Sequence, residues 1–160
     1  MQKEILINQD IQITFFVSIE DPLHEDDFEG YALLSQELTN IQIIGDDFFA
    51  TNIARLQKGI EMKAANSILL KVNQIGTVSE TLKVAEMANK NNYRIVVSNR
   101  TGDTEEDIIA DIAVGLSTGQ IKAGALARNE RISNYNRLLR IEEELGEKAQ
   151  YAGREFREHF

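Results

Sequence analysis

Short runs rich in isoleucine and valine alternate with longer amphipathic segments between residues 11 and 145. Runs of this kind are typical of strands in a parallel sheet that is covered on its faces. The predicted strands are residues 13–19, 41–44, 67–72, 93–98 and 120–123. The predicted helices are residues 28–38, 52–64, 77–92, 104–116 and 130–145. Because one helix separates consecutive strands, the sequence predicts an α/β fold of about five parallel βα units.

Units of this type form either an open, doubly wound sheet or a closed barrel. In both, the functional side chains gather at the carboxyl ends of the strands. Charged or amide side chains stand at all five of these ends: Glu20-Asp21, Asp46-Asp47, Lys71 with Asn73, Asn99-Arg100 and Lys122. We therefore expect these side chains to share one site.

Composition narrows the classes of function. The chain has 160 residues with 17 basic and 26 acidic side chains and a formal charge of −9, and its basic residues do not cluster apart from carboxylates. Nucleic acid and anionic membrane surfaces are therefore poor partners for it. The absence of cysteine excludes disulfides, thiolate metal ligands and a cysteine nucleophile. Without a long apolar stretch or a signal-peptide pattern at residues 1–4, we expect a cytoplasmic protein.

Lys71 and Lys122 each end an apolar run. A lysine that is desolvated at a strand end has a lowered pKa and acts as a base or as an electrostatic clamp. A lysine in the same position also often serves only in packing or stays solvated. The pattern alone leaves both interpretations open.

Glu20 and Asp46 follow neighbouring strands. Their carboxylates are suitable ligands for a hard divalent cation, of which Mg²⁺ is the natural candidate. Alternatively, Asp46 or Asp47 caps the helix that begins near Asn52, and a lysine holds Glu20. Two acids opposite two lysines are typical of sites where a cation stabilises an enediolate while a lysine removes the adjacent proton.

The segment from Asn99 to Asp103 is a turn after a buried strand. The guanidinium of Arg100 and the hydroxyl of Thr101 are suited to binding phosphate, although turns of this composition are also common without a ligand. His24 and His159 are expected at the surface, and no Ser/His/Asp arrangement is present.

Five segments resemble, in the same order, signature sequences of enolase, the phosphopyruvate hydratase family. They are Ser-Ile-Glu-Asp-Pro (18–22), Ile-Gly-Asp-Asp (44–47), Leu-Leu-Lys-Val-Asn-Gln-Ile-Gly-Thr (69–77), Gly-Leu-Ser-Thr-Gly-Gln-Ile-Lys-Ala-Gly (115–124) and residues 135–146, Tyr-Asn-Arg-Leu-Leu-Arg-Ile-Glu-Glu-Glu-Leu-Gly. The resemblance covers residues 16–156 and is to the C-terminal part of the family's barrel. It implies a partial (β/α) barrel.

The resemblance also implies roles. Glu20 and Asp46 would be magnesium ligands, and Lys71 would be the catalytic base that takes the proton from C2 of 2-phosphoglycerate. Lys122 would be a second catalytic residue, in contact with the substrate carboxylate. The substrate phosphate would be held by Arg100 and Thr101, beside Asn99.

Two departures from the family pattern bear on activity. Asn99 stands where the family has a histidine, and an amide neither carries charge nor shuttles a proton. In addition, the family's N-terminal domain and first barrel strands have no counterpart in this sequence. By resemblance, those parts carry the third carboxylate ligand, the glutamates that assist departure of the hydroxyl, and the loops that close over the substrate.

We expect a single truncated barrel domain, with residues 1–12 either unrelated to the family or flexible and residues 147–160 forming a tail. Five strands cut from a barrel leave two bare edges and an apolar inner face. A complementary chain, a homo-oligomer or rearrangement into an open sheet with helices on both faces would cover them, and we favour self-association.

Three hypotheses for function follow. The chain is an enolase component that is inactive alone and works with the missing half-site, or a non-catalytic enolase-like protein that binds a ligand or a protein, or an assembly subunit. Retention of both lysines and both acids favours the first, since burial of charge without a function is costly. Asn99 and the missing upstream half favour the second.

Overall fold

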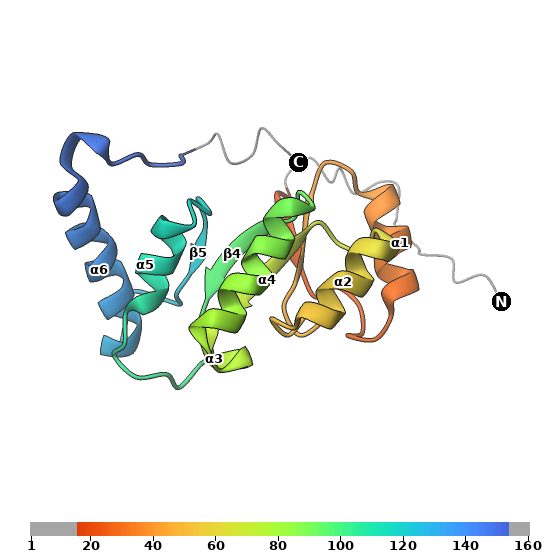
Figure 1. Cartoon of the computed structure of the whole chain (residues 1–160), viewed down its shortest axis with the longest axis horizontal. Coiled ribbons are helices and arrows are strands. Elements are labelled where there is room, and N and C mark those ends of the chain that lie inside the picture. Colours follow the sequence, from red (N-terminus) through yellow and green to blue (C-terminus); the bar gives the residue numbers. More distant parts are fainter. Residues whose placement is uncertain (1–15, 154–160) are drawn as a thin grey trace.

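The computed structural model describes residues 16–153. Predictions for part of the first strand, for residues 1–12 and for His159 lie outside the described residues. Five strands pair in parallel and in sequential order: β1 (Ser18–Glu20), β2 (Gln42–Gly45), β3 (Ser67–Lys71), β4 (Arg94–Ser98) and β5 (Ile121–Lys122). The main helices are α1 (Phe28–Glu37), α2 (Ile53–Met62), α4 (Val78–Lys90), α5 (Ile108–Gly115) and α6 (Asn129–Leu145). Figure 1 shows these elements following one another across the molecule.

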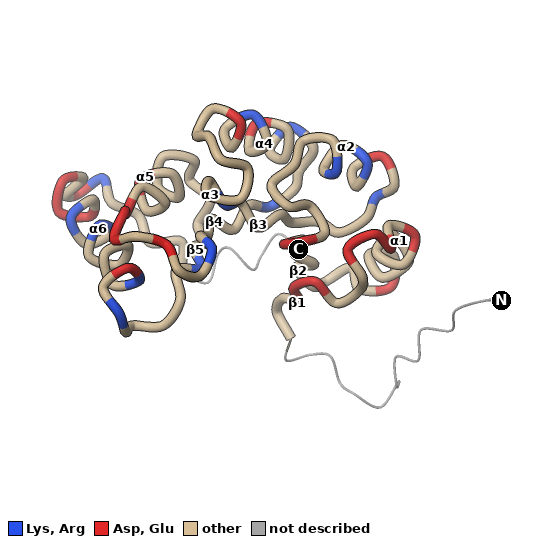
Figure 2. The backbone as a smooth tube through the Cα atoms, turned by 90° about the horizontal axis from the view of Figure 1, so that it is seen from below, with Lys and Arg blue, Asp and Glu red and all other residues tan. Residues whose placement is uncertain are grey.

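The sheet is curled into half of a barrel. Seen along the strands, it forms an arc with the helices around its outer, convex side (Figure 2). Sequential parallel strands with helices on one side only are the arrangement of a (β/α) barrel. The partial barrel is therefore confirmed, and the open sheet with helices on both faces is wrong.

The strand register separates the two faces of the sheet. Residues that pair across parallel strands point to the same side. Ile68 and its partner Ile95 pack in the main core beneath the helices. Leu69 and its partner Val96 point the other way and join Ile44 in a separate cluster on the concave face. Every second residue of a strand therefore faces the inside of the half-barrel.

An aromatic cluster supports the sheet beneath α1 and α2. The side chains of Tyr31, Phe48 and Phe49 are fully buried, and the rings of Tyr31 and Phe48 stack with centroids 3.7 Å apart. Phe49 lies so close to Gly45 that a Cβ atom there would come within 2.5 Å of its ring. Burial of each large apolar side chain contributes roughly 1.5–3 kcal/mol. Packing of these aromatic rings thus fixes the turn after β2.

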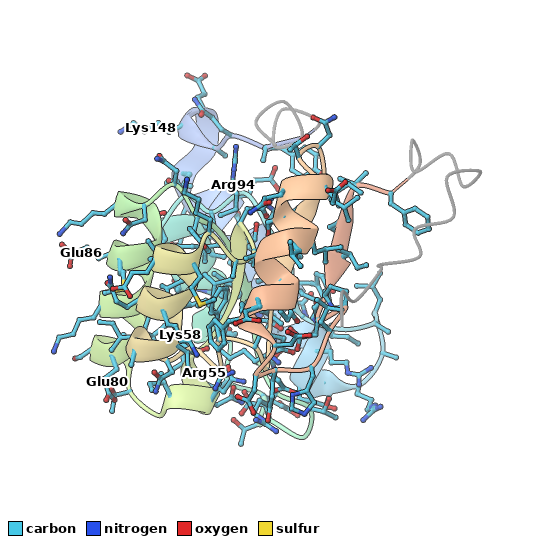
Figure 3. All side chains as sticks on the ribbon, turned by 90° about the vertical axis from the view of Figure 1, so that its right-hand side faces the viewer. Arg55, Lys58, Glu80, Glu86, Arg94 and Lys148 are labelled. Atoms are coloured by element: carbon cyan, nitrogen blue, oxygen red, sulfur yellow. The ribbon has the colours of Figure 1, made fainter. Side chains whose placement is uncertain are left out.

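Charged side chains of α2 fasten α1 to the same region. The ring of Phe28 in α1 has the Lys58 ammonium 4.0 Å and the Arg55 guanidinium carbon 5.3 Å from its centroid. Figure 3 shows both cations extending from α2, whereas Glu80 and Glu86 of α4 point away from the molecule. Cations at this distance from an aromatic face are attracted to it.

The helix boundaries follow local hydrogen bonding. The helix predicted from residue 77 is α4, and Thr77 is its N-cap, since Thr77 Oγ1 accepts a hydrogen bond from Glu80 N at 3.2 Å. The predicted helix at residues 104–116 begins only at Ile108. The carboxylate of Asp103 accepts from Thr104 N instead, and such local bonds compete with helix formation. Two short segments, α3 (Val72–Ile75) and η2 (Gly146–Lys148), were not predicted.

The two edge strands differ from the interior of the sheet in exposure. All three residues of β1 are exposed, while all five residues of β3 are buried.

Within residues 16–153, no helix combines the length and the apolar character that a membrane crossing requires.

Candidate active site at the strand ends

The predicted site residues lie at one end of the half-barrel. Glu20, Lys71 and Lys122 are the last residues of β1, β3 and β5, while Asp46 and Asn99 directly follow β2 and β4. Because all strands are parallel, these ends meet at the same edge of the sheet.

The register also aims these side chains. Lys71 pairs with Ser98, and Ser98 pairs with Lys122, so all three point to one side. Lys71 lies two residues after Leu69, which belongs to the concave cluster. Both lysines therefore face the inside of the half-barrel.

Lys71 and Asp46 form a buried ion pair. The lysine Nζ donates to Asp46 Oδ1 at 2.7 Å and to Oδ2 at 2.6 Å, and the two side chains are only 10% and 16% exposed. The backbone N–H of Lys71 donates to Thr51 Oγ1 at 3.0 Å, and Thr51 is fully buried. Lys71 is thus fixed at its backbone and at its ammonium group.

Lys122 and Glu20 form a second pair that joins the two edge strands. The Lys122 Nζ donates to both carboxylate oxygens of Glu20 at 2.6 Å. Their side chains are 48% and 32% exposed, so water screens this pair more than the first. The alternative that a lysine holds Glu20 is therefore confirmed, and that lysine is Lys122.

The helix-cap alternative for the acids is wrong. Asn52 is the N-cap of α2, and its side chain accepts from the N–H groups of Ala54 and Arg55. Asp46 therefore remains available to Lys71, while Asp47 is exposed.

Carboxylate oxygens suit Mg²⁺, but the positions of these acids do not by themselves make a metal site. Within residues 16–153, no three acidic or histidine side chains gather closely enough to hold a metal ion. In addition, both oxygens of Glu20 and both oxygens of Asp46 accept from a lysine. A cation there would compete with the two ammonium groups and would need further ligands.

Beside the second pair lies a pocket of about 240 Å³. Its lining includes Asn99, Arg100, Thr101 and Lys122, together with Arg131 from α6. All the predicted substrate-binding residues are thus brought together around one cavity. Two guanidinium groups and an ammonium group outnumber the single carboxylate of the lining, that of Glu130, and favour an anionic ligand.

The turn that carries Arg100 is held by amide and carboxylate side chains. Arg100 N donates to Asn73 Oδ1 at 3.2 Å, and Asn73 Nδ2 donates to Asp103 Oδ2 at 2.9 Å. These bonds occupy the backbone of the turn. Among the residues that the structure describes, the Arg100 guanidinium has no hydrogen bond or ion pair, which leaves it available to a ligand.

Sequence reasoning placed Asp21 at the strand ends but assigned it no role. Its carboxylate accepts from the N–H groups of Asp46 and Asp47 and from the hydroxyl of Tyr31. Burial and the nearby Asp21 charge raise the pKa of Tyr31, so this hydroxyl stays protonated. The position of Asp21 between Glu20 and Pro22 was the only signal for it.

The prediction for His24 is confirmed. It is exposed in the loop after β1, where its Nδ1 accepts from Asp26 N at 3.2 Å. It takes no part in the strand-end site.

Comparison with known proteins places nearly all of this sequence in one family. Residues 6–160 match the family model described as enolase, C-terminal TIM barrel domain. The enolase of Methanocaldococcus jannaschii is 62% identical over 141 residues, which are 88% of this chain and 33% of that protein. The enolase of Corynebacterium kroppenstedtii is 60% identical over 139 residues, 86% of this chain and 33% of that protein.

The chain therefore spans about a third of the length of the curated relatives it matches. The family model covers nearly all of the sequence and begins at residue 6, upstream of the first signature segment. This chain belongs to the enolase family and corresponds to the C-terminal part of its TIM barrel domain.

Proposed function

We propose that this chain supplies the C-terminal half of an enolase-type active site. The reaction is the hydro-lyase step of glycolysis that converts 2-phosphoglycerate to phosphoenolpyruvate and water. The observation that carries the proposal is the grouping of two lysine–carboxylate pairs and a cationic pocket at one end of the half-barrel. Curated relatives at about 60% identity that are named enolase support the same reaction.

In this proposal each residue group has a separate task. Lys71 takes the proton from C2 of the substrate, and Lys122 contacts the substrate carboxylate. Arg100 and Thr101 hold the phosphate in the pocket that they line together with Asn99. Glu20 and Asp46 would hold a magnesium ion, which supplies positive charge beside the substrate carboxylate.

The ion pairs imply an order of events for these side chains. Lys71 donates to both oxygens of Asp46, so it must leave that carboxylate and lose a proton to solvent before its neutral amine accepts the proton from C2. Lys122 likewise must leave Glu20 before it contacts a substrate carboxylate. Binding of the anionic substrate and loss of the Lys122–Glu20 pair are therefore coupled, since the Lys122 ammonium group exchanges one carboxylate for another.

Residues 1–160 alone are proposed to be inactive. The described residues bring no three metal-binding side chains together, and they provide five strands for the barrel. The remaining strands must come from elsewhere, either on the same polypeptide or on a second chain, or two copies must associate through their exposed edges. A phosphorylated small molecule remains the proposed ligand, with the Arg100 pocket as its site.

A second candidate is a non-catalytic enolase-like protein that binds its ligand or a protein without turnover. Asn99 favours it, because it lines the pocket where the family carries a histidine and an amide cannot shuttle a proton. The lysine–carboxylate pairs would then serve in binding or as ion pairs only.

A chimera separates the two candidates. Residues 16–160 would replace the matching C-terminal third of the Methanocaldococcus jannaschii enolase, so that the relative supplies the missing strands. We expect magnesium-dependent formation of phosphoenolpyruvate from 2-phosphoglycerate, abolished by Lys71→Ala. The Asn99→His variant of the chimera measures the effect of the amide on turnover.

The outcomes differ for the two candidates. Activity with Asn99 in place supports the enzyme component. A folded chimera that binds 2-phosphoglycerate but turns it over only as the Asn99→His variant supports the binding protein. A folded chimera that neither binds nor converts the substrate in either form contradicts both.

A further inference from the structure

Asp21 adopts an unusual backbone conformation directly after β1. Its φ of +42° lies in the left-handed region, which aspartate tolerates better than most residues. Its N–H donates to the carbonyl of Ile44 at 3.0 Å and so extends the pairing of β1 with β2 by one residue. The chain is thus still attached to β2 at the point where it turns.

The Asp21 side chain then crosses to the turn after β2. Oδ1 accepts from Asp46 N at 2.8 Å and Oδ2 accepts from Asp47 N at 2.7 Å. Hydrogen bonds to an ionised carboxylate are stronger than neutral ones, and two parallel bonds also fix orientation. The Asp21 carboxylate therefore binds the backbone N–H groups of both Asp46 and Asp47.

Tyr31 of α1 supports both partners of this contact. Its hydroxyl donates to Asp21 Oδ1 at 3.3 Å, and its fully buried ring stacks on Phe48, the next residue after Asp47. The hydroxyl also lies 3.3 Å from the carbonyl of Leu23. One side chain thus contacts the loop after β1 and the turn after β2.

We propose that Asp21, oriented by Tyr31, is a positioning residue that sets the place of the Asp46 carboxylate and, through the buried ion pair, of the Lys71 ammonium. The proposal rests on the proposed function, in which Asp46 and Lys71 act on the metal and the substrate. Asp21 itself faces the backbone of the turn, so it acts through Asp46.

A carboxylate is required at this position. Asparagine offers one oxygen for two N–H groups and turns its own NH₂ donor toward the second. The Asp21→Asn variant therefore loses one bond and gains a contact between two donors. Tyr31→Phe keeps the stacked ring and removes only the hydroxyl.

Two matched controls are present in the chain. Asp26→Asn removes the same charge from the same loop, at a side chain that is 67% exposed and paired with Arg55. Tyr93→Phe removes a hydroxyl that is also buried and also bonded to a backbone carbonyl, that of Ala64 at 3.0 Å. Neither Asp26 nor Tyr93 lines the strand-end site.

The test uses the full 160-residue chain without metal. Hydrogen exchange by NMR gives the protection of the Asp46 and Asp47 amides, and the rate of acetylation by acetic anhydride gives the accessibility of Lys71 relative to the exposed Lys90. In Asp21→Asn we expect both amides to exchange, and Lys71 to react, about tenfold faster, as for loss of one charge-assisted hydrogen bond. Tyr31→Phe should show the same changes with a smaller size.

Core amides of β3 and β4 must stay protected in every variant, which shows that the fold persists. Unchanged exchange at Asp46 and Asp47 in both Asp21→Asn and Tyr31→Phe overturns the proposal. So does a Lys71 reactivity that rises no more than in the Asp26→Asn and Tyr93→Phe controls.

In the chimera described above, Asp21→Asn should lower kcat by about 10- to 100-fold, the usual effect of residues that orient a metal ligand. An inactive unmodified chimera contradicts the proposed function alone, since exchange and acetylation of the isolated chain still decide on Asp21. An active chimera in which Asp21→Asn has no effect on kcat contradicts the positioning role.

Discussion

The two lysine–carboxylate pairs of the site differ in how deeply they are buried. The Lys71–Asp46 pair is 10% and 16% exposed, whereas the Lys122–Glu20 pair is 48% and 32% exposed. Removal of one partner from a buried pair leaves an unpaired charge in a poorly solvated place, while an exposed carboxylate regains water. The two pairs therefore have unequal roles in stability.

We predict that Lys71→Met lowers the free energy of unfolding by about 3 kcal/mol. Lys122→Met should lower it by less than about 1 kcal/mol. Urea unfolding of both variants measures the difference. Adding Asp46→Asn to Lys71→Met removes the unpaired charge and should recover most of the loss. Equal losses in the two single variants would show that burial does not distinguish the pairs.

At this scale the sequence predicts most of the site. The lysines and acids stand out because polar side chains at the ends of apolar strands all reach one edge of a parallel sheet. Which lysine pairs with which acid was not predictable. The Lys122–Glu20 pair, for example, depends on the curl of the sheet that brings β1 within reach of β5. Asp21 was missed because its contacts are to backbone N–H groups, and these leave no pattern in the side chains.

Among the elements, an arginine of α6 forms an ion pair with α5. Arg137 donates to Asp111 Oδ2 at 2.9 Å and to Oδ1 at 2.6 Å, and it also donates to Glu144 at 2.8 Å. The hydrogen bonds from Arg137 lower the pKa of Asp111 below its usual value. The Asp111 side chain is 44% exposed, so solvent screening limits the contribution to about 0.5 kcal/mol.

The lowered pKa gives this contact a predictable pH dependence. A carboxylate with a folded-state pKa below its unfolded one stabilises the fold fully above the unfolded value of about 4. The contribution is lost as the pH falls through the lower, folded-state value. The difference in unfolding free energy between the unmodified chain and Asp111→Asn should therefore be present at neutral pH and vanish in acid. A difference that does not change with pH would contradict this account of the contact.

The start of α4 offers a test of a single cap. Thr77 Oγ1 accepts from Glu80 N and also donates to Glu80 Oε2 at 2.6 Å. Thr77→Ala should lower the unfolding free energy by about 1 kcal/mol, the usual value for a lost N-cap. Ser79→Ala, at an exposed position in the same helical turn, is the control and should have no such effect when both are measured by thermal unfolding.

The elements show why some boundaries followed from the sequence and others did not. The start of α4 was predicted correctly because its cap joins Thr77 to Glu80, only three residues away. The late start of α5 depends on Asp103, which bonds both to Thr104 and to Asn73 thirty residues away. Periodicity of apolar residues reports the buried face of a helix but not such competing contacts.

In the whole molecule, the five strands and their order followed from the βα repeat, and the resemblance to enolase gave the barrel. The sequence did not predict what covers the edges of the sheet. An exposed strand such as β1 and an apolar inner face with Ile44, Leu69 and Val96 are compatible with several partners. The exposure of β1 fits its place at the edge of a half-barrel.

The most direct measurement is the rate of phosphoenolpyruvate formation as a second polypeptide, carrying the upstream two-thirds of a matched enolase, is titrated into the 160-residue chain with Mg²⁺ present. We predict no turnover by either polypeptide alone, a rate that rises and saturates on mixing, and loss of that rate with Lys71→Met. Turnover by the 160-residue chain alone would contradict the account. So would a complex that forms, binds 2-phosphoglycerate and remains inactive, because Lys71, Lys122 and their carboxylates would then be parts of a binding site.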